Sequence, residues 1–490
     1  MLRKSARIAA RTAGFILASF LLVAVTLILA RAIILRSGPA LDWWHTEVIS
    51  AEFRADDKDA VTNLEQYLER EVEVFAELQA KVEAHAGQHQ RQRLNRYAKD
   101  NHSYPVKAGL NLNRSAVLRP PSIRGGVLLL HGMTDSPYTL RHLAAMFHAQ
   151  GFYVLNLRLP GHGTLPSELD RVSWQDWYEP VKFAAKHVSE QIKNYQPFYL
   201  VGYSNGGSLA LKYSMDSLDD VGARIPDHVF LLSPMIGVDP MARFSRLFNW
   251  IGYLDYFRQS RWLETYPEYD PHKYNSFPMH AALQSYLLTT SVKEQLKRIE
   301  KNGRLEQMPP VLTFQSLVDK TVVTSAIWDT LYEKMPVNGS ELVIFDANRL
   351  GVLDEFILPK HKILLNRIMN ESSGKYAVSV ITNRAPDNPE VLELRQRPGV
   401  PGFTGRPLDY AWPDDVYSLS HVALPFPVND PVYGLEPDED EGSYPHIGKV
   451  FMVGEAGALI LPSTLSQRLR SNPFYGYIET RLTEVENVTP

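Results

Sequence analysis

The chain has 490 residues, of which 44% are apolar and 22% charged; these are the proportions of a globular protein with one core and several insertions, or with two domains. The formal net charge of −4 gives no reason to expect a nucleic-acid partner. The chain contains no cysteine, which excludes a thiol nucleophile, disulfides and thiolate metal sites but leaves the compartment open.

The first predicted element is an uncharged apolar segment at 12–30, within an N-terminal region at 1–36. Its length approaches the roughly 20 residues that a helix needs to span a bilayer. Basic residues crowd its N-terminal side, which predicts a cytoplasmic N-terminus, a single membrane anchor and the remaining chain on the outer side. The alternative is a cleaved secretory signal ending near Ala30-Arg31-Ala32, but the segment exceeds the usual ~7–15-residue signal core. Both alternatives place most of the chain outside the cytoplasm.

Residues 37–110 are predicted to form a helical N-terminal extension. Apolar residues recur there at spacings of three and four, the pattern of an amphipathic helix: Leu64, Leu68, Val72, Phe75, Leu78 and Val82. We expect this helix to serve as a spacer or a brace packed on the next domain, with a partner-binding helix as the alternative.

Between 111 and 236, short apolar runs alternate with amphipathic helical patterns. "GGVLLLHG", "FYVLNL" and "FYLV" are typical of buried parallel strands, and the segment that begins at Ser173 has the pattern of a capped helix. The alternation resumes at 306–350. This order predicts an α/β fold, with a mostly parallel sheet covered by helices on both faces.

Two insertions interrupt the alternation, and a third region ends the chain. Residues 237–305 are predicted to form a cap or lid, and residues 351–415 a helix, a strand pair and a Pro/Gly-rich loop. Residues 416–490 form a C-terminal extension. The first insertion is rich in bulky aromatic residues: Phe244, Phe248, Trp250, Tyr253, Tyr256, Phe257, Trp262, Tyr266 and Tyr269.

The stretch Gly202-Tyr203-Ser204-Asn205-Gly206 has the pattern of a nucleophile elbow, in which a serine stands on a tight strand-to-helix turn. It follows the apolar run "FYLV" and precedes a helical pattern, as the elbow requires. Gly202 and Gly206 leave room for the reversal of the chain, and the turn exposes the Ser204 hydroxyl at the positive end of a helix. The alternative is an ordinary helix-capping serine. The context favours a catalytic nucleophile.

A serine nucleophile needs an orienting acid and a histidine base, which follow it in the order acid, then histidine. Asp319 comes just after the apolar run "VLTFQS", where a carboxylate can meet an imidazole at the carboxyl edge of the sheet. Asp346 and Asp354 are the competing acids. We predict Asp319 as the acid.

Three histidines follow Asp319. His361 lies in a lysine-flanked helical pattern, and His446 follows a proline-rich loop with no preceding strand. His421 lies in the short apolar stretch "VYSLSHVALPFP", which suits a firmly held imidazole. We predict His421 as the base, with a buried structural histidine as the alternative.

The oxyanion of an acyl-transfer intermediate needs backbone N–H donors. The strand "GVLLL" ends in His131-Gly132, and Gly132 allows the backbone to approach a substrate closely. We predict the N–H groups of Met133 and Asn205 as the oxyanion pair. His131 precedes the serine in the chain, so we expect it to brace this loop and not to act as the base.

The motifs "GVLLLHGMTDSP", "NLRLPGHGT" and "GYSNGG", in this order, resemble the α/β-hydrolase superfamily, in its monoacylglycerol lipase, carboxylesterase and serine aminopeptidase-like branch. The resemblance implies an eight-stranded, mostly parallel sheet, a cap domain, no cofactor and no metal. It supports Ser204, Asp319, Met133 and Asn205 in the roles given above. His421 departs from the pattern, because family members bring the histidine soon after one more strand. The insertion at 351–415 is expected to leave the sheet and return.

The sequence thus predicts a membrane-anchored serine hydrolase of carboxylic esters that acts through an acyl-enzyme. The aromatic insertion is consistent with a lipid-like or acyl substrate, such as a monoacylglycerol or a lysophospholipid, and equally with aromatic side chains that only pack the cap on the core; the membrane anchor favours the lipid substrate. The alternatives are a serine aminopeptidase-like peptidase and a catalytically silent scaffold.

Overall fold

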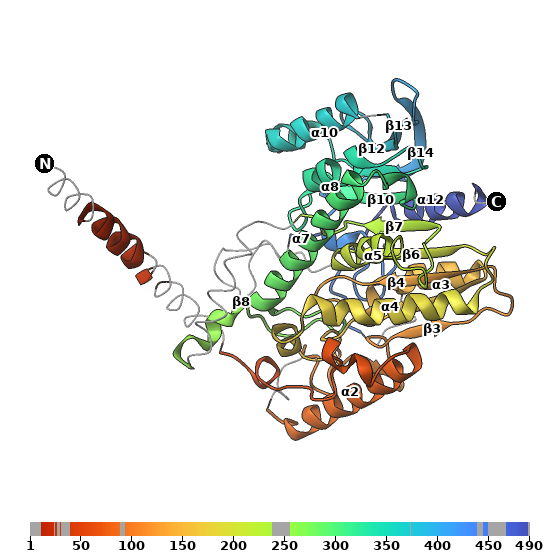
Figure 1. Ribbon diagram of the computed structural model, residues 1–490. Helices are drawn as coiled ribbons and strands as arrows, with labels where there is room; N and C mark the ends of the chain where they lie inside the picture. Colours follow the sequence, from red (N-terminus) through yellow and green to blue (C-terminus); the bar gives the residue numbers. More distant parts are fainter. Residues whose placement is uncertain are drawn as a thin grey trace, which may run out of the picture.

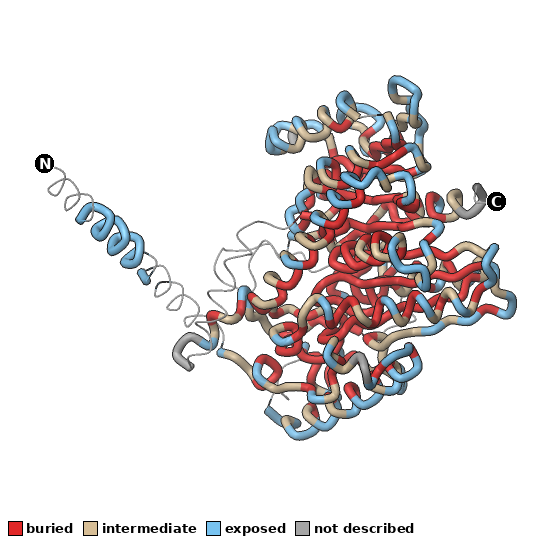
Figure 2. The backbone as a smooth tube through the Cα atoms, viewed as in Figure 1, coloured by how far each residue is buried: buried red, intermediate tan, exposed pale blue. Residues whose placement is uncertain are grey.

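The molecule is described by a computed structural model (Figure 1). The structure describes residues 11–23, 25, 26, 30, 40–88, 94–237, 255–372, 374–438, 444–448 and 467–488. Residues 11–23 are helical and exposed on all sides (Figure 2). Within the described ranges, no helix has both the length and the apolar character needed to cross a membrane, and part of the segment at 12–30 lies outside these ranges.

A ten-stranded sheet forms the centre of the protein, in the order β14-β13-β12-β11-β10-β7-β6-β4-β5-β3. The strands are β3 (Ala116–Leu118), β4 (Gly125–Leu130), β5 (Phe152–Leu157), β6 (Phe198–Tyr203), β7 (His228–Leu232), β10 (Val311–Ser316), β11 (Glu341–Phe345), β12 (Ala377–Ala385), β13 (Asn388–Gln396) and β14 (Thr404–Ala411). From β5 to β12 all neighbours are parallel, whereas β3, β13 and β14 pair antiparallel. The expectation of eight strands is therefore wrong for this chain.

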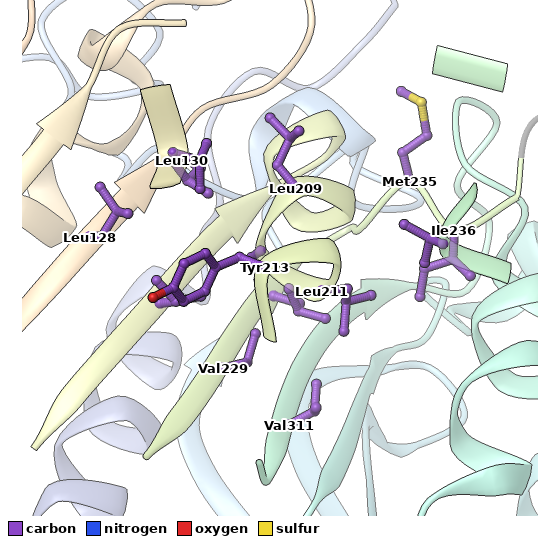
Figure 3. Close-up of a cluster of buried hydrophobic side chains, with 14 of the residues drawn as sticks. Leu128, Leu130, Leu209, Leu211, Tyr213, Val229, Met235, Ile236 and Val311 are labelled. Atoms are coloured by element: carbon purple, nitrogen blue, oxygen red, sulfur yellow. The ribbon is translucent and has the colours of Figure 1, made fainter. Parts of the chain in front are cut away.

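Helices cover both faces of the sheet, as the alternating pattern predicted. On β4, Leu128 and Leu130 pack into one core with helices α4 (Trp174–Gln191), α5 (Asn205–Asp216) and α7 (Met279–Lys301). Val127 and Leu129 point to the opposite face, where they share a core with α3 (Arg141–Ala149) and α12 (Tyr475–Val488). Figure 3 shows part of the first core, in which Leu211 and Tyr213 of α5 face the strands.

The N-terminal extension packs onto this body. It contains η1 (Trp43–His45), η2 (Ala55–Asp59) and α2 (Leu64–Ala84), and α2 runs alongside α4. Asn63 caps α2 by accepting a hydrogen bond from the N–H of Gln66. Val72 is 52% exposed, so one of the residues assigned to the apolar face lies off the packed side of the helix.

A buried ion-pair cluster fastens this extension to the loop after β5. The guanidinium of Arg158 donates to both carboxylate oxygens of Glu52, at 2.9 and 3.1 Å, and to Glu71 of α2 at 3.2 Å. All three residues are at most 2% exposed. Removing one member of such a cluster would leave an unpaired buried charge, so the extension is bound firmly to the body.

The elements of the two insertions pack elsewhere than predicted. The predicted cap contains η6 (Asp255–Arg261), β8 (Trp262–Glu264) and β9 (Phe277–Pro278), but its last part, α7, packs against α4 and α5 in the main core. Assigning α7 to a cap was wrong, because its apolar face covers the sheet-facing helices. The aromatic residues Phe244, Phe248, Trp250 and Tyr253 lie outside the described residues, as do the side chains of Tyr256 and Phe257.

The insertion at 351–415 stays in the sheet. It forms α9 (Gly351–Phe356) and α10 (Pro359–Glu371), and then β12, β13 and β14, which extend the sheet beyond β11. Figure 1 shows these strands at one end of the molecule, next to α10. The expectation that this segment leaves the sheet is wrong.

Candidate active site

Ser204 occupies the turn between β6 and α5, with φ of 52° and ψ of −116°. This left-handed conformation is rare for a residue with a side chain, and it reverses the chain within one residue. The N–H of Ser204 donates to the carbonyl of Leu232 at 3.0 Å, and its own carbonyl accepts from the N–H groups of Gly207 and Met235. These bonds hold the serine at the carboxyl edge of the sheet.

Glycines around Ser204 make the turn possible. A Cβ at Gly202 would lie 2.6 Å from the carbonyl oxygen of Gly206, and one at Gly206 would overlap the carbonyl oxygen of Leu130. Gly207, which sequence reasoning did not single out, has the same role, because a Cβ there would lie 2.7 Å from that of Pro234. A side chain at Gly202 would push β6 and α5 apart, one at Gly206 would strike the end of β4, and one at Gly207 would strike the loop after β7.

Asp319 and His421 are in direct contact. Asp319 lies in the turn after β10, and its Oδ2 is 2.8 Å from Nδ1 of His421, which begins the short helix η9 (His421–Ala423). Oδ1 of Asp319 accepts from the N–H groups of Thr321 and Val322 at 2.7 and 2.9 Å, and Gln315 donates to Oδ2 at 3.2 Å. Burial alone would raise the pKa of Asp319. The charge and hydrogen bond of His421, together with these N–H groups, outweigh it, and the pKa lies below its ordinary value.

A return segment at 416–419 explains how His421 reaches this position. The chain leaves β14 and runs back across the carboxyl ends of β11 and β10. There the N–H of Asn348 donates to the carbonyl of Tyr417 at 2.8 Å, and the Ser316 hydroxyl donates to the carbonyl of Leu419 at 2.8 Å. His421 follows directly and meets Asp319, although 102 positions separate them in the chain.

Ser204 and His421 line one cavity of about 260 Å³. Its walls are mainly apolar and include Met133, Tyr203 and Met235. The ring of Tyr203 lies 5.2 Å from the imidazole of His421, and its hydroxyl donates to the His421 carbonyl at 3.4 Å. The elbow residue before the serine therefore also supports the histidine.

Met133 and Asn205, the predicted oxyanion pair, come from two different segments of the site. Met133 is in the cavity wall, in the loop after β4, and Asn205 is the first residue of α5. The first N–H groups of a helix have no partner within the helix, so the N–H of Asn205 is suited to bind a negative oxygen.

His131 and Gly132 shape the loop that carries Met133. Nε2 of His131 accepts from the N–H of Leu159 at 3.1 Å, and Nδ1 donates to the carbonyl of Gly132 at 2.9 Å, so the imidazole joins the loops after β4 and β5. Burial lowers the pKa of His131 to about 3, which keeps it neutral. A Cβ at Gly132 would lie 2.6 Å from the Asp135 carboxylate, so the loop has no room for a side chain there.

The competing candidates are engaged elsewhere. Asp346 pairs with Arg349 at 2.6 Å, and Asp354 pairs with the same arginine at 2.7 Å. His361 lies on α10, and Nδ1 of His446 donates to the Pro431 carbonyl at 2.7 Å. Across the described ranges, no group of three or more histidine, aspartate or glutamate side chains is arranged to hold a metal ion.

Sequence reasoning missed several cavity residues. Lys273 comes from the predicted cap, and Arg468 and Arg470 from the C-terminal extension; Tyr269, one of the aromatic residues noted in the cap, also lines the cavity. Arg468 and Arg470 are separated by one apolar residue in the sequence, and this alternation is a signal that both side chains point the same way. Only the fold shows which cavity they line.

Comparisons with known proteins place these observations in a family. Residues 121–353 match the family model described as serine aminopeptidase, S33. A stretch of 111 residues, 23% of this chain, is 32% identical to a thermostable monoacylglycerol lipase of Bacillus sp. (strain H-257) and spans 43% of that protein.

Among solved structures, the monoacylglycerol lipase of Paleococcus ferrophilus is 18% identical, with a TM-score of 0.36 over 47% of this chain and 88% of that one. A soluble variant of the monoglyceride lipase of Saccharomyces cerevisiae is 14% identical, with a TM-score of 0.36 over 50% of this chain and 89% of that one. The matched segment at 121–353 carries the serine elbow and most of the parallel sheet, and this segment is similar to the α/β-hydrolase superfamily, in a lipase- and esterase-like branch.

Proposed function

We propose that the protein is a serine hydrolase of carboxylic esters, with Ser204 as nucleophile, His421 as base and Asp319 as orienting acid. The observation that carries the proposal is the 2.8 Å contact between Asp319 and His421 at the cavity that also holds Ser204. Ser204 and His421 line this cavity, Asp319 contacts His421, and the order serine, acid, histidine along the chain supports acyl transfer.

In this mechanism the Ser204 hydroxyl attacks the acyl carbonyl while His421 takes its proton. Asp319 fixes the ring of His421 through Nδ1, so that Nε2 is the proton acceptor, and it stabilises the imidazolium that forms. The N–H groups of Met133 and Asn205 bind the oxyanion. His421 then protonates the leaving alcohol, and a water molecule, activated by the same base, releases the acyl group from the enzyme.

The substrate class we infer is lipid-like or acyl esters. The cavity walls are mainly apolar, and apolar walls favour apolar chains. The family relative from Bacillus is named a monoacylglycerol lipase. An esterase, a monoacylglycerol lipase and a lysophospholipase all fit this description.

Labelling and hydrolysis test the proposal together. A fluorophosphonate probe should label the wild type and fail to label Ser204→Ala. In a panel of p-nitrophenyl esters, Ser204→Ala and His421→Ala should lose several orders of magnitude in kcat/KM, on the scale of ~10⁴-fold or more. His446→Ala is the matched control, because its ring binds a carbonyl away from Ser204. Normal turnover by His421→Ala would contradict the assignment of the base.

Peptide hydrolysis is the second candidate function, because the matched family model is described as a serine aminopeptidase. Such an enzyme needs a charged group for the amino terminus of the peptide, and acidic residues do line the cavity. Assaying ester and aminoacyl substrates side by side separates the two activities. A protein that neither hydrolyses these substrates nor reacts with fluorophosphonate is the silent scaffold.

We also propose that the apolar segment at 12–30 anchors the protein, with the catalytic domain on the outer side of the membrane; a secreted form after signal cleavage is the alternative. The basic residues before this segment support the orientation. Full-length protein should sediment with membranes, and a variant without residues 1–36 should not. A mature protein that begins after Ala32 would establish the secreted form.

A further inference from the structure

The C-terminal segment at 467–472 forms part of the wall of the cavity that holds Ser204. It runs beside the loop that carries the histidine: the N–H of Asn472 donates to the carbonyl of Phe426 at 2.7 Å, and the Ser420 hydroxyl donates to the carbonyl of Leu469. The end of the chain, which carries no recognisable motif, is therefore built into the site.

Side chains of this segment alternate between the core and the cavity. Leu469 is buried in the apolar core beneath the sheet, while its neighbours Arg468 and Arg470 line the cavity. Both arginines are partly exposed, so their guanidinium groups are accessible from the cavity. Two arginines thus stand on the same wall as Ser204 and His421.

Neither arginine has a carboxylate partner among the residues that the structure describes. Arg468 donates to the Thr321 hydroxyl at 2.7 Å, and Arg470 donates to the Tyr269 hydroxyl at 3.2 Å. A guanidinium has five N–H donors, so these single bonds to neutral groups leave most of them for a ligand. Arg158 and Arg349, by contrast, are held by two carboxylates each.

Three carboxylates also line this cavity. Asp135 is paired with Lys273 at 2.9 Å. Asp270 is fully buried and accepts hydrogen bonds from the Tyr433 hydroxyl at 2.6 Å and from the N–H groups of His272 and Lys273. Glu264 is exposed. Within the described residues, no hydrogen bond or ion pair joins Asp270 or Glu264 to either arginine, so both guanidinium groups keep N–H donors for a ligand.

We propose that Arg468 and Arg470 bind an oxyanion of the substrate, so that the preferred substrates are acyl esters with a phosphate or carboxylate group near the scissile bond. Guanidinium groups recognise both oxyanions through paired, charge-assisted hydrogen bonds. The apolar walls hold the acyl chain, and the arginines hold the charged end. This inference rests on the proposed ester hydrolysis and narrows it to anionic esters, such as an acylglycerol phosphate.

Matched substrates test the inference. We would compare kcat/KM for a short-chain monoacylglycerol, its phosphate ester, an ester of the same acyl chain bearing a carboxylate, and one bearing an ammonium group. Soluble short chains avoid effects of a lipid surface. At low ionic strength the wild type should prefer at least one anionic ester over the neutral one by about tenfold or more, and added salt should weaken the preference.

Variants then assign the preference to the two side chains. The double change Arg468→Gln with Arg470→Gln should lower the ratio of anionic to neutral kcat/KM by about tenfold. Changing both to lysine should give an intermediate ratio, because lysine keeps the charge but not the paired geometry. Arg397→Gln, at an exposed position after β13, is the matched control and should leave the ratio unchanged.

The outcomes separate this inference from the proposed function. A wild type that hydrolyses the neutral ester through Ser204 but shows no anionic preference, or prefers the ammonium ester, overturns the inference alone. An anionic preference that survives the double glutamine change also overturns it. Hydrolysis that is the same in Ser204→Ala overturns the proposed function. A preference for phosphate or for carboxylate identifies the oxyanion.

Discussion

At the level of single residues, the strained backbone of Ser204 is linked to its place in the turn between β6 and α5. Its backbone conformation costs on the order of 1–3 kcal/mol for a residue with a side chain. The hydrogen bonds to Leu232, Gly207 and Met235 hold it there. The strained turn places Ser204 at the N-terminus of α5, in the wall of the cavity that His421 also lines. This placement is the reason to expect a reactive serine.

Replacing Asp319 by asparagine tests the residue that orients the histidine. The variant keeps the shape of the side chain but loses the negative charge that faces Nδ1 of His421, so the imidazolium is no longer stabilised. We expect kcat for ester hydrolysis to fall by roughly 10³–10⁴-fold with a small change in KM. Asp354→Asn is the matched control, because that carboxylate is half-exposed and pairs with Arg349 and Lys362. Equal losses in the two variants would contradict the role of Asp319.

At the level of elements, β6, α5 and β4 can approach one another closely because the residues between them are glycines, which have no side chain. Gly206 lies where a methyl group would strike the carbonyl oxygens of Leu130 and His131, and both belong to a buried strand end that has no space to move. The turn therefore fixes the distance between α5 and the sheet as well as the position of the serine.

Gly206→Ala should consequently damage folding, and not activity alone. We expect a loss of unfolding free energy at the high end of single substitutions, about 3 kcal/mol or more, measured by chemical denaturation. Gly405→Ala on β14 is the control, because the nearest atom to its Cβ would be 3.5 Å away, an ordinary contact. A stable Gly206→Ala protein with native spectra would show that the turn opens more easily than the geometry indicates.

The elements also show which parts of the site could be predicted. The serine turn and Asp319 follow apolar runs directly, and such runs reveal a buried strand wherever they lie in a sequence. The sequence indicates His421 only by elimination among three histidines. Its position depends on β12, β13 and β14 and on the return segment at 416–419, which local sequence patterns do not predict. The wrong assignment of α7 to the cap has the same cause. Its amphipathic pattern predicts a helix, but the pattern does not show which surface of the protein the helix covers.

At the level of the whole molecule, segments from outside 121–353 support the cavity that holds Ser204. The N-terminal extension binds Arg158 through Glu52 and Glu71, and the next residue, Leu159, donates to His131 in the loop after β4. The C-terminal segment at 467–472 brings Arg470 into the cavity wall. The segment that matches the family model therefore contains the proposed nucleophile and acid, whereas the proposed base, His421, and Arg470 come from outside it.

Buried histidines make the stability of the whole molecule depend on pH, and His162 gives the clearest test. Burial lowers its pKa to about 3, from an ordinary value of 6.5. Between these values the unfolded chain binds a proton that the folded protein does not, so acid favours unfolding by up to ~1.4 kcal/mol per pH unit. Burial raises the pKa of Glu268 and Asp170 to about 7, so these carboxyl groups change the pH dependence of the unfolding free energy in the opposite direction.

The difference between the wild type and His162→Gln isolates the histidine, since the opposing carboxyl groups are common to both proteins. The substitution should cost most at pH 7, and the cost should shrink as the pH falls from 6.5 toward 4, because glutamine binds no proton in either state. Chemical denaturation at several pH values measures this difference. His102→Gln, at an exposed position, should give a difference that does not vary with pH. A constant difference for His162→Gln as well would mean that its imidazole is protonated equally in the folded and unfolded protein.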